Sequence, residues 1–271
     1  MAPVSVVVPC YCCAGTIRRA LASVAEQTMV PCEVILVEDA SPDDGKTREM
    51  LNLVVAEYGH VFAIKTIFMN GNVGAASARN RGWDAASQPY IAFLDADDAW
   101  HPRKIEIQYA YMMIHRDVVL CGHLHRFLED NDLLPDWDLP QPEEQAIHKW
   151  KMLLSNPFVT PSVMLRRDVA QRFIENQRHM EDHMLWLRII CSGGIVVRLT
   201  NELAAIYKRP FGMAGLSAQF WLMEKGDLGN YRRLYYEKCI NVYQLSVLSI
   251  YSLLKYMRRL LIYWGNLRWK K

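Results

Sequence analysis

The sequence predicts an α/β fold: a mostly parallel, doubly wound sheet with helices on both faces, and then a C-terminal helical extension. Three observations support this prediction. Short runs rich in Val and Ile alternate with segments of helical periodicity through the first half of the chain. The spacing between successive runs fits β-α-β crossovers, which join parallel strands. The runs are apolar throughout rather than alternating, as strands buried on both faces are.

Five strands and four helices are expected in this half. The strands are the apolar runs at 4–9, 33–39, 63–68, 90–94 and 118–124. The helices lie between them, at 16–25, 43–58, 74–86 and 102–116. The first helix places Ile17, Leu21 and Val24 on one face, and the fourth opens with a proline, which the first turn of a helix tolerates.

The second half is less regular. Residues 129–144 are acidic and rich in proline, which predicts a long loop. Five elements are expected after it: a strand and then a helix within 159–173, a helix from near Glu181 to Gly193, and strands at 195–200 and 203–208.

The charges of the chain are unevenly distributed. Of its 271 residues 51% are hydrophobic and 22% charged, which is enough apolar material for a packed core. The net charge is only +2, but residues 231–271 carry nine Lys and Arg and one Glu, whereas the first 230 carry 22 basic and 28 acidic residues. The acidic body argues against a nucleic-acid partner, and the basic tail suggests an anionic surface such as lipid.

The seven cysteines indicate a reducing compartment. Cys10, Cys12 and Cys13 lie close together, but no CxxC pair occurs, which is poor spacing for a zinc site or a disulfide framework. We therefore expect reduced thiols in a cytoplasmic protein. The first ten residues also lack the basic region and the long apolar region of a signal peptide.

Three carboxylates, Asp95, Asp97 and Asp98, come directly after the strand expected at 90–94. Two acids one residue apart can hold one Mg²⁺ or Mn²⁺ ion, whose other ligands are commonly water and substrate phosphates. Such a site predicts a substrate that contains phosphate, such as a nucleotide. The same residues also fit a charged turn between strand and helix, in which Asp98 caps the next segment of chain.

Further candidate ligand-binding residues lie at the ends of neighbouring strands. Pro9 and Tyr11 come after the first strand and Asp39 ends the second, so they should open onto the same sheet edge as Asp95. Asp39 can accept hydrogen bonds from a base or a ribose, or it can belong to a turn. Arg79 lies on a helix rich in small residues; it can reach an anionic ligand at this edge, or it can be a surface side chain of a packing helix.

Five segments, in this order, resemble the family 2 glycosyltransferases. They are VSVVVPCYCCAGTIRRALASVAEQT, VILVEDASPDDG, NVGAASARNRG, YIAFLDADDAWHPRKIE and RHMEDHMLWLRI, within residues 3–207. Each segment is short, and it is their order and spacing that make the resemblance specific. The resemblance implies a fold of the GT-A kind, a nucleotide-sugar donor, and transfer with inversion at the anomeric carbon.

The resemblance also implies roles for the residues at the sheet edge. Pro9, Tyr11 and Asp39 would line a nucleoside pocket. Arg79 would lie near the ribose or the diphosphate, and Asp95 would contact the ribose or the sugar.

For the reaction itself, the resemblance implies that Asp97 binds a divalent cation, Mn or Mg, and that Asp182 is the base that takes a proton from the acceptor hydroxyl. On a helix the neighbouring Glu181 points about 100° away, so we do not expect both carboxylates at one substrate atom. The sequence departs from the family pattern at Cys12, where Asn is frequent, and at Ala40, where Gly is frequent.

Four histidines lie near these segments. His179 and His183 are expected to be surface or helix-start residues rather than auxiliaries of the base. His123 and His125 lie on one face at the end of the fifth strand, and one of them could reach the metal.

Residues 207–220 join a strand to a helix. Their glycines, with Lys208 and Arg209, suit either a loop that closes over a diphosphate or a simple connection. A nucleotidyltransferase is disfavoured, because the segment PCYCCAGTIRRA lacks a glycine- and lysine-rich activating loop.

The tail has the composition of a membrane-surface helix. Residues 239–254 carry no charge, but this run of 16 is shorter than the roughly 20 residues that span a bilayer. The mixture of Leu, Tyr and Trp with Lys and Arg in 253–271 suits helices that lie in a membrane interface. The alternatives are a helical pair packed on the catalytic domain and a subunit contact.

We therefore expect a catalytic domain at 1–220, with a nucleotide-sugar half at about 1–125 and an acceptor half at about 126–220, and a basic amphipathic tail at 221–271. The predicted function is metal-dependent, inverting transfer of a sugar from a nucleotide, with UDP favoured, to a hydroxyl of a glycan or lipid-linked acceptor in polysaccharide or glycolipid biosynthesis. The predicted location is the cytoplasmic face of the inner membrane, as a peripheral protein. The alternative is a non-catalytic nucleotide-sugar-binding or membrane scaffold protein on the same fold.

Overall fold

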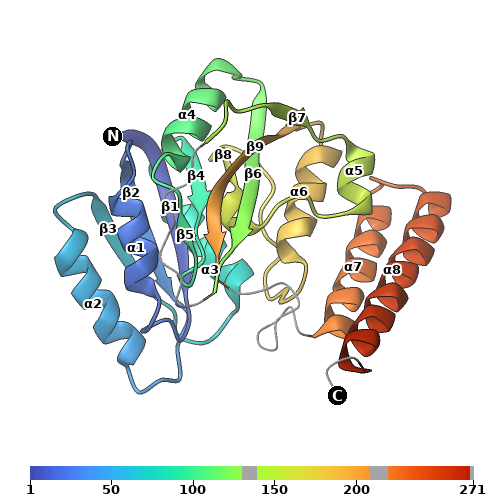
Figure 1. Ribbon diagram of the computed structural model, residues 1–271, viewed down its shortest axis with the longest axis horizontal. Coiled ribbons are helices and arrows are strands. Elements are labelled where there is room, and N and C mark those ends of the chain that lie inside the picture. Colours follow the sequence, from blue (N-terminus) through green and yellow to red (C-terminus); the bar gives the residue numbers. More distant parts are fainter. Residues whose placement is uncertain (130–138, 208–218, 269–271) are drawn as a thin grey trace.

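The computed structural model describes residues 1–129, 139–207 and 219–268, with side chains up to 262. It has a central sheet, helices on both faces of that sheet, and a helical hairpin at the C-terminal side (Figure 1). The strand order is β3-β2-β1-β4-β8-β6-β9-β5, and β7 pairs with β9.

Strands and helices alternate along the chain. The strands are β1 (Ala2–Cys10), β2 (Pro31–Glu38), β3 (Ala63–Phe68), β4 (Tyr90–Phe93), β5 (Ala99–Trp100), β6 (Val118–Phe127), β7 (Glu144–Ala146), β8 (Met164–Arg166) and β9 (Ile195–Ile206). The helices are α1 (Ile17–Ala25), α2 (Lys46–Tyr58), α3 (Ala75–Ala85), α4 (Lys104–Ile114), α5 (Lys149–Leu154), α6 (Glu181–Cys191), α7 (Phe220–Tyr236) and α8 (Val242–Arg268), with one 3₁₀ turn at Thr160–Ser162.

The first half of the sheet is parallel. β1 lies between β2 and β4, and β3 pairs with β2, all in the same direction. Val7 of β1 stands opposite both Ile35 of β2 and Phe93 of β4, so the three strands run toward one edge of the sheet. This edge faces downward in Figure 1, where the N-terminal ends of α6 and α7 also lie. The predicted α/β class and the predicted strands of this half are confirmed.

The second half combines one long parallel pair with three short antiparallel strands. β6 and β9 are parallel, β8 is antiparallel to β4 and β6, and β5 and β7 are antiparallel to β9. The sequence predicts two strands where β9 is continuous. Asn201, between the predicted halves, is fully buried and donates a side-chain hydrogen bond to the Pro140 carbonyl oxygen at 2.7 Å, which holds this position in the sheet. Residues 130–138 of the predicted long loop lie outside the described residues.

Two layers of core lie on the two faces of the sheet. Val6 and Val8 of β1 pack with Ile17 and Leu21 of α1 on one face. Val7 faces the other way and packs in the layer formed with α3, α6 and α7. Because the central strands are covered on both sides, they are apolar along most of their length.

The helix predicted at the end of 159–173 is absent from the structure. The strand part is β8, but the chain from 167 to 180, all of it described, contains no α-helix. Its backbone groups bond to side chains of α3 instead. Phe173 N donates to Asn80 Oδ1 at 3.1 Å, Asn80 Nδ2 donates to Phe173 O at 2.8 Å, and Asn176 N donates to Ser77 Oγ at 3.0 Å. These bonds satisfy groups that a helix would otherwise pair and hold the segment against α3.

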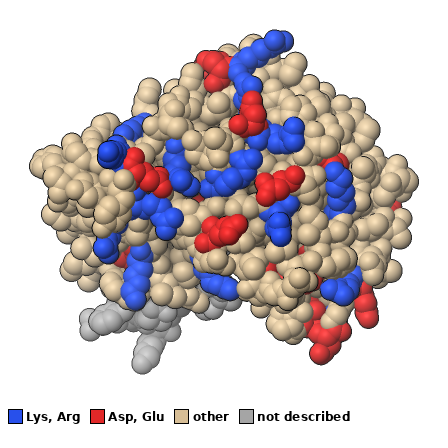
Figure 2. All heavy atoms as spheres, turned by 180° about the vertical axis from the view of Figure 1, so that it is seen from behind, with Lys and Arg blue, Asp and Glu red and all other residues tan. Residues whose placement is uncertain are grey.

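The tail that the sequence predicts to be helical forms two antiparallel helices, α7 and α8 (Figure 1). Among the described segments, no helix has the length and apolar character needed to cross a bilayer. On the face seen in Figure 2 the basic and acidic side chains are intermixed. Basic side chains therefore form no continuous patch on this face.

Candidate active site

Asp39 comes directly after β2 and is buried, with 2% of its surface exposed. Its Oδ1 accepts a hydrogen bond from Val73 N at 2.8 Å, and its Oδ2 accepts bonds from Gly74 N and Asn72 Nδ2, both at 2.8 Å. Asp39 thus fixes the loop that leads into α3. This is the turn-forming role that the sequence left open, and it uses three of the roughly four lone-pair sites of the carboxylate.

The loops after β1 and β2 contain several residues with positive φ angles, among them Cys12, Ala40 and Asp44. Cys12 and Ala40 have positive φ angles of 49° and 51°, in the left-handed region that Gly and Asn adopt most easily. These are the two positions at which the sequence departs from the family pattern. Cys12 N donates to Ser41 Oγ at 2.9 Å, which joins the two loops at the sheet edge. Tyr11 lies beside this junction and is about half exposed.

Arg79 of α3 lies at the centre of the site. The helix approaches the sheet closely, since a Cβ added at Gly82 would lie 2.3 Å from Cγ1 of Val7. Arg79 is almost fully buried; its Nη2 lies 2.7 Å from Asp95 Oδ1 and its Nη1 lies 3.0 Å from Glu181 Oε1. Burial alone would lower the pKa of Arg79, but the charges of Asp95 and Glu181 outweigh it and raise that pKa. The alternative of a surface arginine is therefore excluded.

The three carboxylates after β4 have different surroundings. Asp95 pairs with Arg79, and its carbonyl oxygen accepts a bond from Asp98 N at 3.1 Å, which closes a tight turn. Asp98 is buried and its Oδ1 accepts a bond from Tyr207 N at 3.2 Å. Asp97 is partly exposed, and its carbonyl oxygen accepts a bond from Arg19 at 2.6 Å. Arg79 and a backbone N–H thus bind the carboxylates of Asp95 and Asp98, which would otherwise repel one another.

Glu181 and Asp182 occupy the first turn of α6, after Met180, which has a positive φ of 56°. Their side chains bind different partners, as their 100° separation predicts. Glu181 contacts Arg79, whereas Asp182 Oδ2 accepts a bond from Asn156 Nδ2 at 3.1 Å and Asp182 Oδ1 accepts one from His183 N at 2.6 Å.

Glu181 has a raised pKa because of its surroundings in this turn. Burial, together with the charge of Asp182, raises the pKa of Glu181 to about 7, although Arg79 acts in the opposite direction. The charge of Asp182 also contributes to the raised pKa of Arg79. Asp182 therefore lies within electrostatic reach of the group formed by Arg79, Asp95 and Glu181.

Sequence reasoning missed three residues of this network. No signal in the sequence points to Asn156, the contact partner of Asp182, which lies between α5 and the 3₁₀ turn. Asn72, which bonds to Asp39, could have been noticed, because it opens the segment NVGAASARNRG of the family resemblance. The role of Glu181 as a partner of Arg79 was also missed, since 102 positions separate the two residues.

The histidines have structural surroundings. His183 is buried; its Nε2 lies 2.7 Å from the Met152 carbonyl oxygen and its Nδ1 lies 3.5 Å from Asp227 Oδ1. Of its two expected positions, the start of a helix is correct, since it belongs to the first turn of α6, and the surface is wrong. His123 lies inside β6, which is longer than predicted, and burial lowers its pKa. The loop residues 208–218, which include the basic pair proposed to close over a diphosphate, lie outside the described residues.

The residues present fit a divalent cation of the kind the resemblance implies. Within the described residues, no group of three or more His, Cys, Asp or Glu side chains has the arrangement of a metal site. A cation held by one or two carboxylates and by substrate phosphates does not need such a group. Asp97, partly exposed after β4, offers the hard oxygen ligands that Mg²⁺ and Mn²⁺ prefer.

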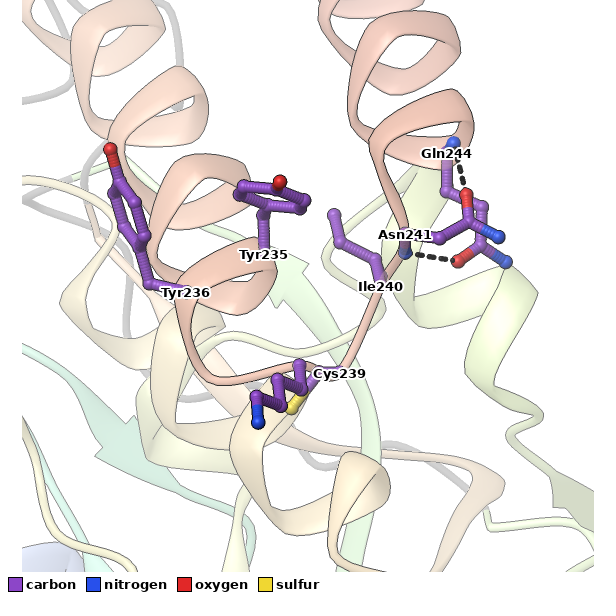
Figure 3. Close-up of a pocket in the computed structure, with 7 residues that line it drawn as sticks. Tyr235, Tyr236, Cys239, Ile240, Asn241 and Gln244 are labelled. Atoms are coloured by element: carbon purple, nitrogen blue, oxygen red, sulfur yellow. Dashed lines mark hydrogen bonds between the residues drawn. The ribbon is translucent and has the colours of Figure 1, made fainter.

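Two hollows occur near the C-terminal hairpin. The larger, about 600 Å³, lies at the turn between α7 and α8. Figure 3 shows that Asn241 and Gln244 there bond reciprocally, with Asn241 N to Gln244 Oε1 at 2.9 Å and Gln244 N to Asn241 Oδ1 at 2.8 Å. This is a capping arrangement at the start of α8, at the end of the hairpin away from the carboxyl edge of β1 (Figure 1). The smaller hollow, about 430 Å³, lies between residues 174–179 and α7.

Known proteins with similar sequences and folds are glycosyltransferases. The family model described as "Glycosyl transferase family 2" matches residues 5–173. The chain is 30% identical over 205 residues to UDP-Glc:alpha-D-GlcNAc-diphosphoundecaprenol beta-1,3-glucosyltransferase WfaP of Escherichia coli, covering 76% of each chain.

Two solved structures share the fold. TarS 1–349 of S. aureus in complex with UDP-GlcNAc has a TM-score of 0.69 at 16% identity, covering 92% of this chain and 71% of that one. The mannosyltransferase PcManGT of Pyrobaculum calidifontis in complex with GDP-Man and Mn²⁺ has a TM-score of 0.65 at 16% identity, covering 87% and 64%. At such identities the likeness supports the GT-A-like fold.

Proposed function

The chain belongs to glycosyl transferase family 2, and on this premise we propose that it transfers a sugar, with inversion, from a nucleotide donor to a hydroxyl of a lipid-linked or glycan acceptor. One observation carries the proposal. Arg79 links Asp95, at the donor edge of the sheet, to Glu181, the neighbour of Asp182. Groups for the two halves of the reaction, far apart in the chain, are thereby held in one buried network.

Asp182 is the proposed base. Inverting transfer needs a base on one side of the anomeric carbon and the leaving group on the other. Asn156 and His183 N each donate to one oxygen of Asp182, which fixes the carboxylate while lone pairs remain for a proton. Glu181 forms an ion pair with Arg79 instead. In this proposal Asp182 accepts the proton and Glu181 stabilises the arrangement of the site.

The donor is proposed to bind at the carboxyl edge of β1, β2 and β4. Pro9, Tyr11 and Asp39 would line the nucleoside part, and Arg79 and Asp95 would lie near the ribose and diphosphate. A UDP-sugar is favoured, because the name of the E. coli relative specifies UDP-Glc and the TarS structure contains UDP-GlcNAc.

Asp97 is proposed to hold a divalent cation, Mn²⁺ or Mg²⁺. When bound, the cation would neutralise charge on the departing nucleoside diphosphate. The Mn²⁺ in the PcManGT complex and the partly exposed carboxylate of Asp97 support this assignment.

The acceptor is proposed to be lipid-linked, as part of polysaccharide or glycolipid assembly. The E. coli relative acts, by its name, on a sugar attached to diphosphoundecaprenol. Such an acceptor would be presented at a membrane surface, and the protein would be peripheral at the cytoplasmic face.

The structure of α8 supports membrane contact. Its exposed side includes Tyr243, Ile250, Leu254, Met257 and Leu261, each at least 59% exposed, which recur at spacings of three, four and seven on one side of the helix. An apolar face of this kind marks an interaction surface.

The opposite side of α8 faces the protein and combines apolar residues, such as the fully buried Leu248, with polar ones. Ser252 is fully buried, and Lys255 donates to the Leu154 carbonyl oxygen at 2.8 Å. Burial raises the pKa of Glu224 in α7, an effect that Ser252, Arg259 and Lys255 oppose. The helix therefore packs on the protein with a mixed side, which includes the fully buried Leu248, and carries a row of large apolar side chains outward.

We favour lipid over a second copy of the chain as the occupant of this face. A coiled-coil seam uses a narrow stripe, but Tyr251, Leu253 and Ile262 flank the central residues and are also exposed. The exposed Arg258 beside them would meet anionic headgroups.

A panel of nucleotides tests the donor proposal. Thermal unfolding would be measured with UDP, GDP, UDP-sugars and GDP-sugars, each with and without Mn²⁺. Uridine ligands should raise Tm more than guanosine ligands, and Mn²⁺ should increase the effect, because a ligand that binds the native state stabilises it. If no nucleotide raised Tm under either condition, the donor assignment would be wrong.

A further inference from the structure

We propose that the hollow between residues 174–179 and α7 binds the diphosphate of a lipid-linked acceptor; the proposal rests on the function proposed above. Its volume is about 430 Å³, enough for a diphosphate and part of the groups attached to it. One wall is the segment that leads directly into Glu181 and Asp182, and the other is the outer side of α7.

The hollow carries an excess of positive charge. Arg178, Lys225 and Arg233 line it, against the single carboxylate of Glu175. Neither Lys225 nor Arg233 forms an ion pair with a carboxylate among the described residues. Cations that are gathered in a concave surface with few carboxylates to balance them favour an anionic ligand.

The arrangement of these cations favours an extended anion over a single small one. Lys225 and Arg233 are eight positions apart on α7, about 12 Å along the helix axis, and Arg178 stands on the facing wall. Long side chains from three points can converge on a diphosphate, which presents oxygens on two phosphorus centres. Arg178 also donates to Asn72 Oδ1 at 2.8 Å, which holds it toward the loop that Asp39 fixes.

The wall of the hollow and the turn that carries Asp182 are joined by hydrogen bonds. Asn230 Nδ2 donates to the Met180 carbonyl oxygen at 2.9 Å, and Gln177 Nε2 donates to Asn230 Oδ1 at 2.9 Å. α7 also approaches this turn closely, since a Cβ added at Gly226 would lie 3.0 Å from the His179 carbonyl oxygen. A diphosphate bound here is therefore held at a fixed place relative to Asp182, as a sugar hydroxyl attached to it must be.

The hollow also borders the apolar side of the hairpin. Leu222 lines it and is 40% exposed, and the neighbouring Trp221 is 49% exposed and packs against Tyr256 of α8 at a ring distance of 5.7 Å. A lipid chain leaving a diphosphate in the hollow would meet apolar surface. In this arrangement the diphosphate lies between Asp182, the proposed base, and the exposed apolar side of α8. This is the order in which a lipid-linked acceptor carries its sugar, its diphosphate and its lipid.

The test uses the full chain and geranyl diphosphate, a prenyl diphosphate without a sugar. Binding is measured by isothermal titration calorimetry with saturating UDP and Mn²⁺, so that the donor site is filled. Lys225→Gln with Arg233→Gln should weaken binding by about 100-fold, tenfold for each charge-assisted hydrogen bond lost. The matched control is Arg232→Gln, an exposed neighbour of Arg233 that does not line the hollow, and it should bind as the wild type does.

Three results would overturn the proposal. One is equal affinity in the wild type, the double variant and the control. Another is competition between geranyl diphosphate and UDP, which would place the diphosphate in the donor site. The third is a double variant that keeps geranyl diphosphate binding but loses binding to vesicles of phosphatidylcholine with phosphatidylglycerol, which would assign the hollow to phospholipid headgroups. The donor proposal fails separately. If it is wrong, UDP does not bind, and titrating geranyl diphosphate into the wild type and the variants without UDP still tests the hollow.

Discussion

Arg79 Nη2 lies 2.7 Å from Asp95 Oδ1, an ion pair that joins the middle of α3 to the carboxyl end of β4. The arginine is almost fully buried, and its second nitrogen is occupied by Glu181 of α6. Three elements of the fold therefore depend on one cation, and the charge of that cation is balanced by two carboxylates.

Replacing Arg79 should lower both the free energy of unfolding and the activity. Arg79→Gln leaves Asp95 and Glu181 without a counter-charge, and we expect a loss of about 3 kcal/mol in the free energy of unfolding, measured by urea denaturation. Arg18→Gln is the matched control, because its ion pair with Glu57 lies at the surface; it should change stability by less than about 0.5 kcal/mol. Equal stability of the two variants would show that the buried network does not hold these elements together.

Asp182→Asn should abolish transfer and leave donor binding unchanged. The amide keeps the size of the side chain but cannot accept the proton of an attacking hydroxyl, so we expect kcat to fall by at least about 100-fold, as removal of a general base commonly does. The donor Kd should stay within about twofold, since Asp182 contacts Asn156 rather than the residues at the donor edge. Near-normal turnover by this variant would show that another group is the base.

The raised pKa of Glu181 gives the protein a defined pH dependence. Its pKa lies near 7 in the folded state against an ordinary value of 4.5, so between these values the folded protein binds a proton that the unfolded chain has released. Its stabilising contribution is therefore complete below about pH 4.5 and is lost as the pH rises through 7.

This dependence can be isolated with Glu181→Gln, which cannot titrate. The difference in unfolding free energy between wild type and variant should shift against the wild type by roughly 2–3 kcal/mol from pH 5 to pH 8. Urea denaturation at several pH values measures it, and titration of other groups cancels in the difference. A difference that stays constant over this range would mean that Glu181 is ionised throughout.

Ala40→Gly should stabilise the protein. Ala40 has a φ of 51°, and a left-handed conformation costs a residue with a Cβ roughly 1–2 kcal/mol, against a smaller entropic cost for glycine. We expect a net gain of about 0.5–1 kcal/mol in urea denaturation. The control is Ala56→Gly, at an exposed position inside α2, where the same substitution should destabilise by about 1 kcal/mol. A loss of stability at both positions would contradict the strain assigned to Ala40.

The parallel half of the fold could be predicted well from the sequence because its signals are local. The strands at 63–68 and 90–93 were placed within one residue, since apolar runs between turns define them directly. The segment after β8 was misassigned because its backbone is satisfied by Asn80 and Ser77, which are about 90 to 100 positions away.

Some residues of the candidate site could likewise be predicted from local sequence, and others could not. Asp95 could be found from its place after a strand, and Asp182 from its resemblance to a family segment. The burial of Arg79 and its pairing with Glu181 depend on the packing of α3 against α6, which no short stretch of sequence encodes. The contact of Asn156 with Asp182 likewise depends on how the chain between α5 and β8 is folded.

The apolar side of α8 should bind anionic membranes. Leu254→Ser with Met257→Ser removes two large, exposed apolar side chains without touching the side of α8 that packs on the protein. At about 25 cal/mol per Å² of buried apolar surface, we expect the double variant to bind vesicles of phosphatidylcholine with phosphatidylglycerol at least tenfold more weakly in a sedimentation assay. Stability should stay the same or rise, because both side chains are exposed in the isolated protein.

A control substitution elsewhere on the surface tests whether vesicle binding depends on the apolar side of α8 or on any exposed apolar residue. Leu53 of α2 is 54% exposed and lies on another part of the molecule, so Leu53→Ser should bind vesicles as the wild type does. Sedimentation equilibrium of the wild type without lipid tests the competing occupant of the face. A stable dimer that the α8 double variant dissolves, together with unchanged vesicle binding, would show that the apolar side pairs two copies of the chain. A monomer whose vesicle binding depends on Leu254 and Met257 would assign that side to the membrane.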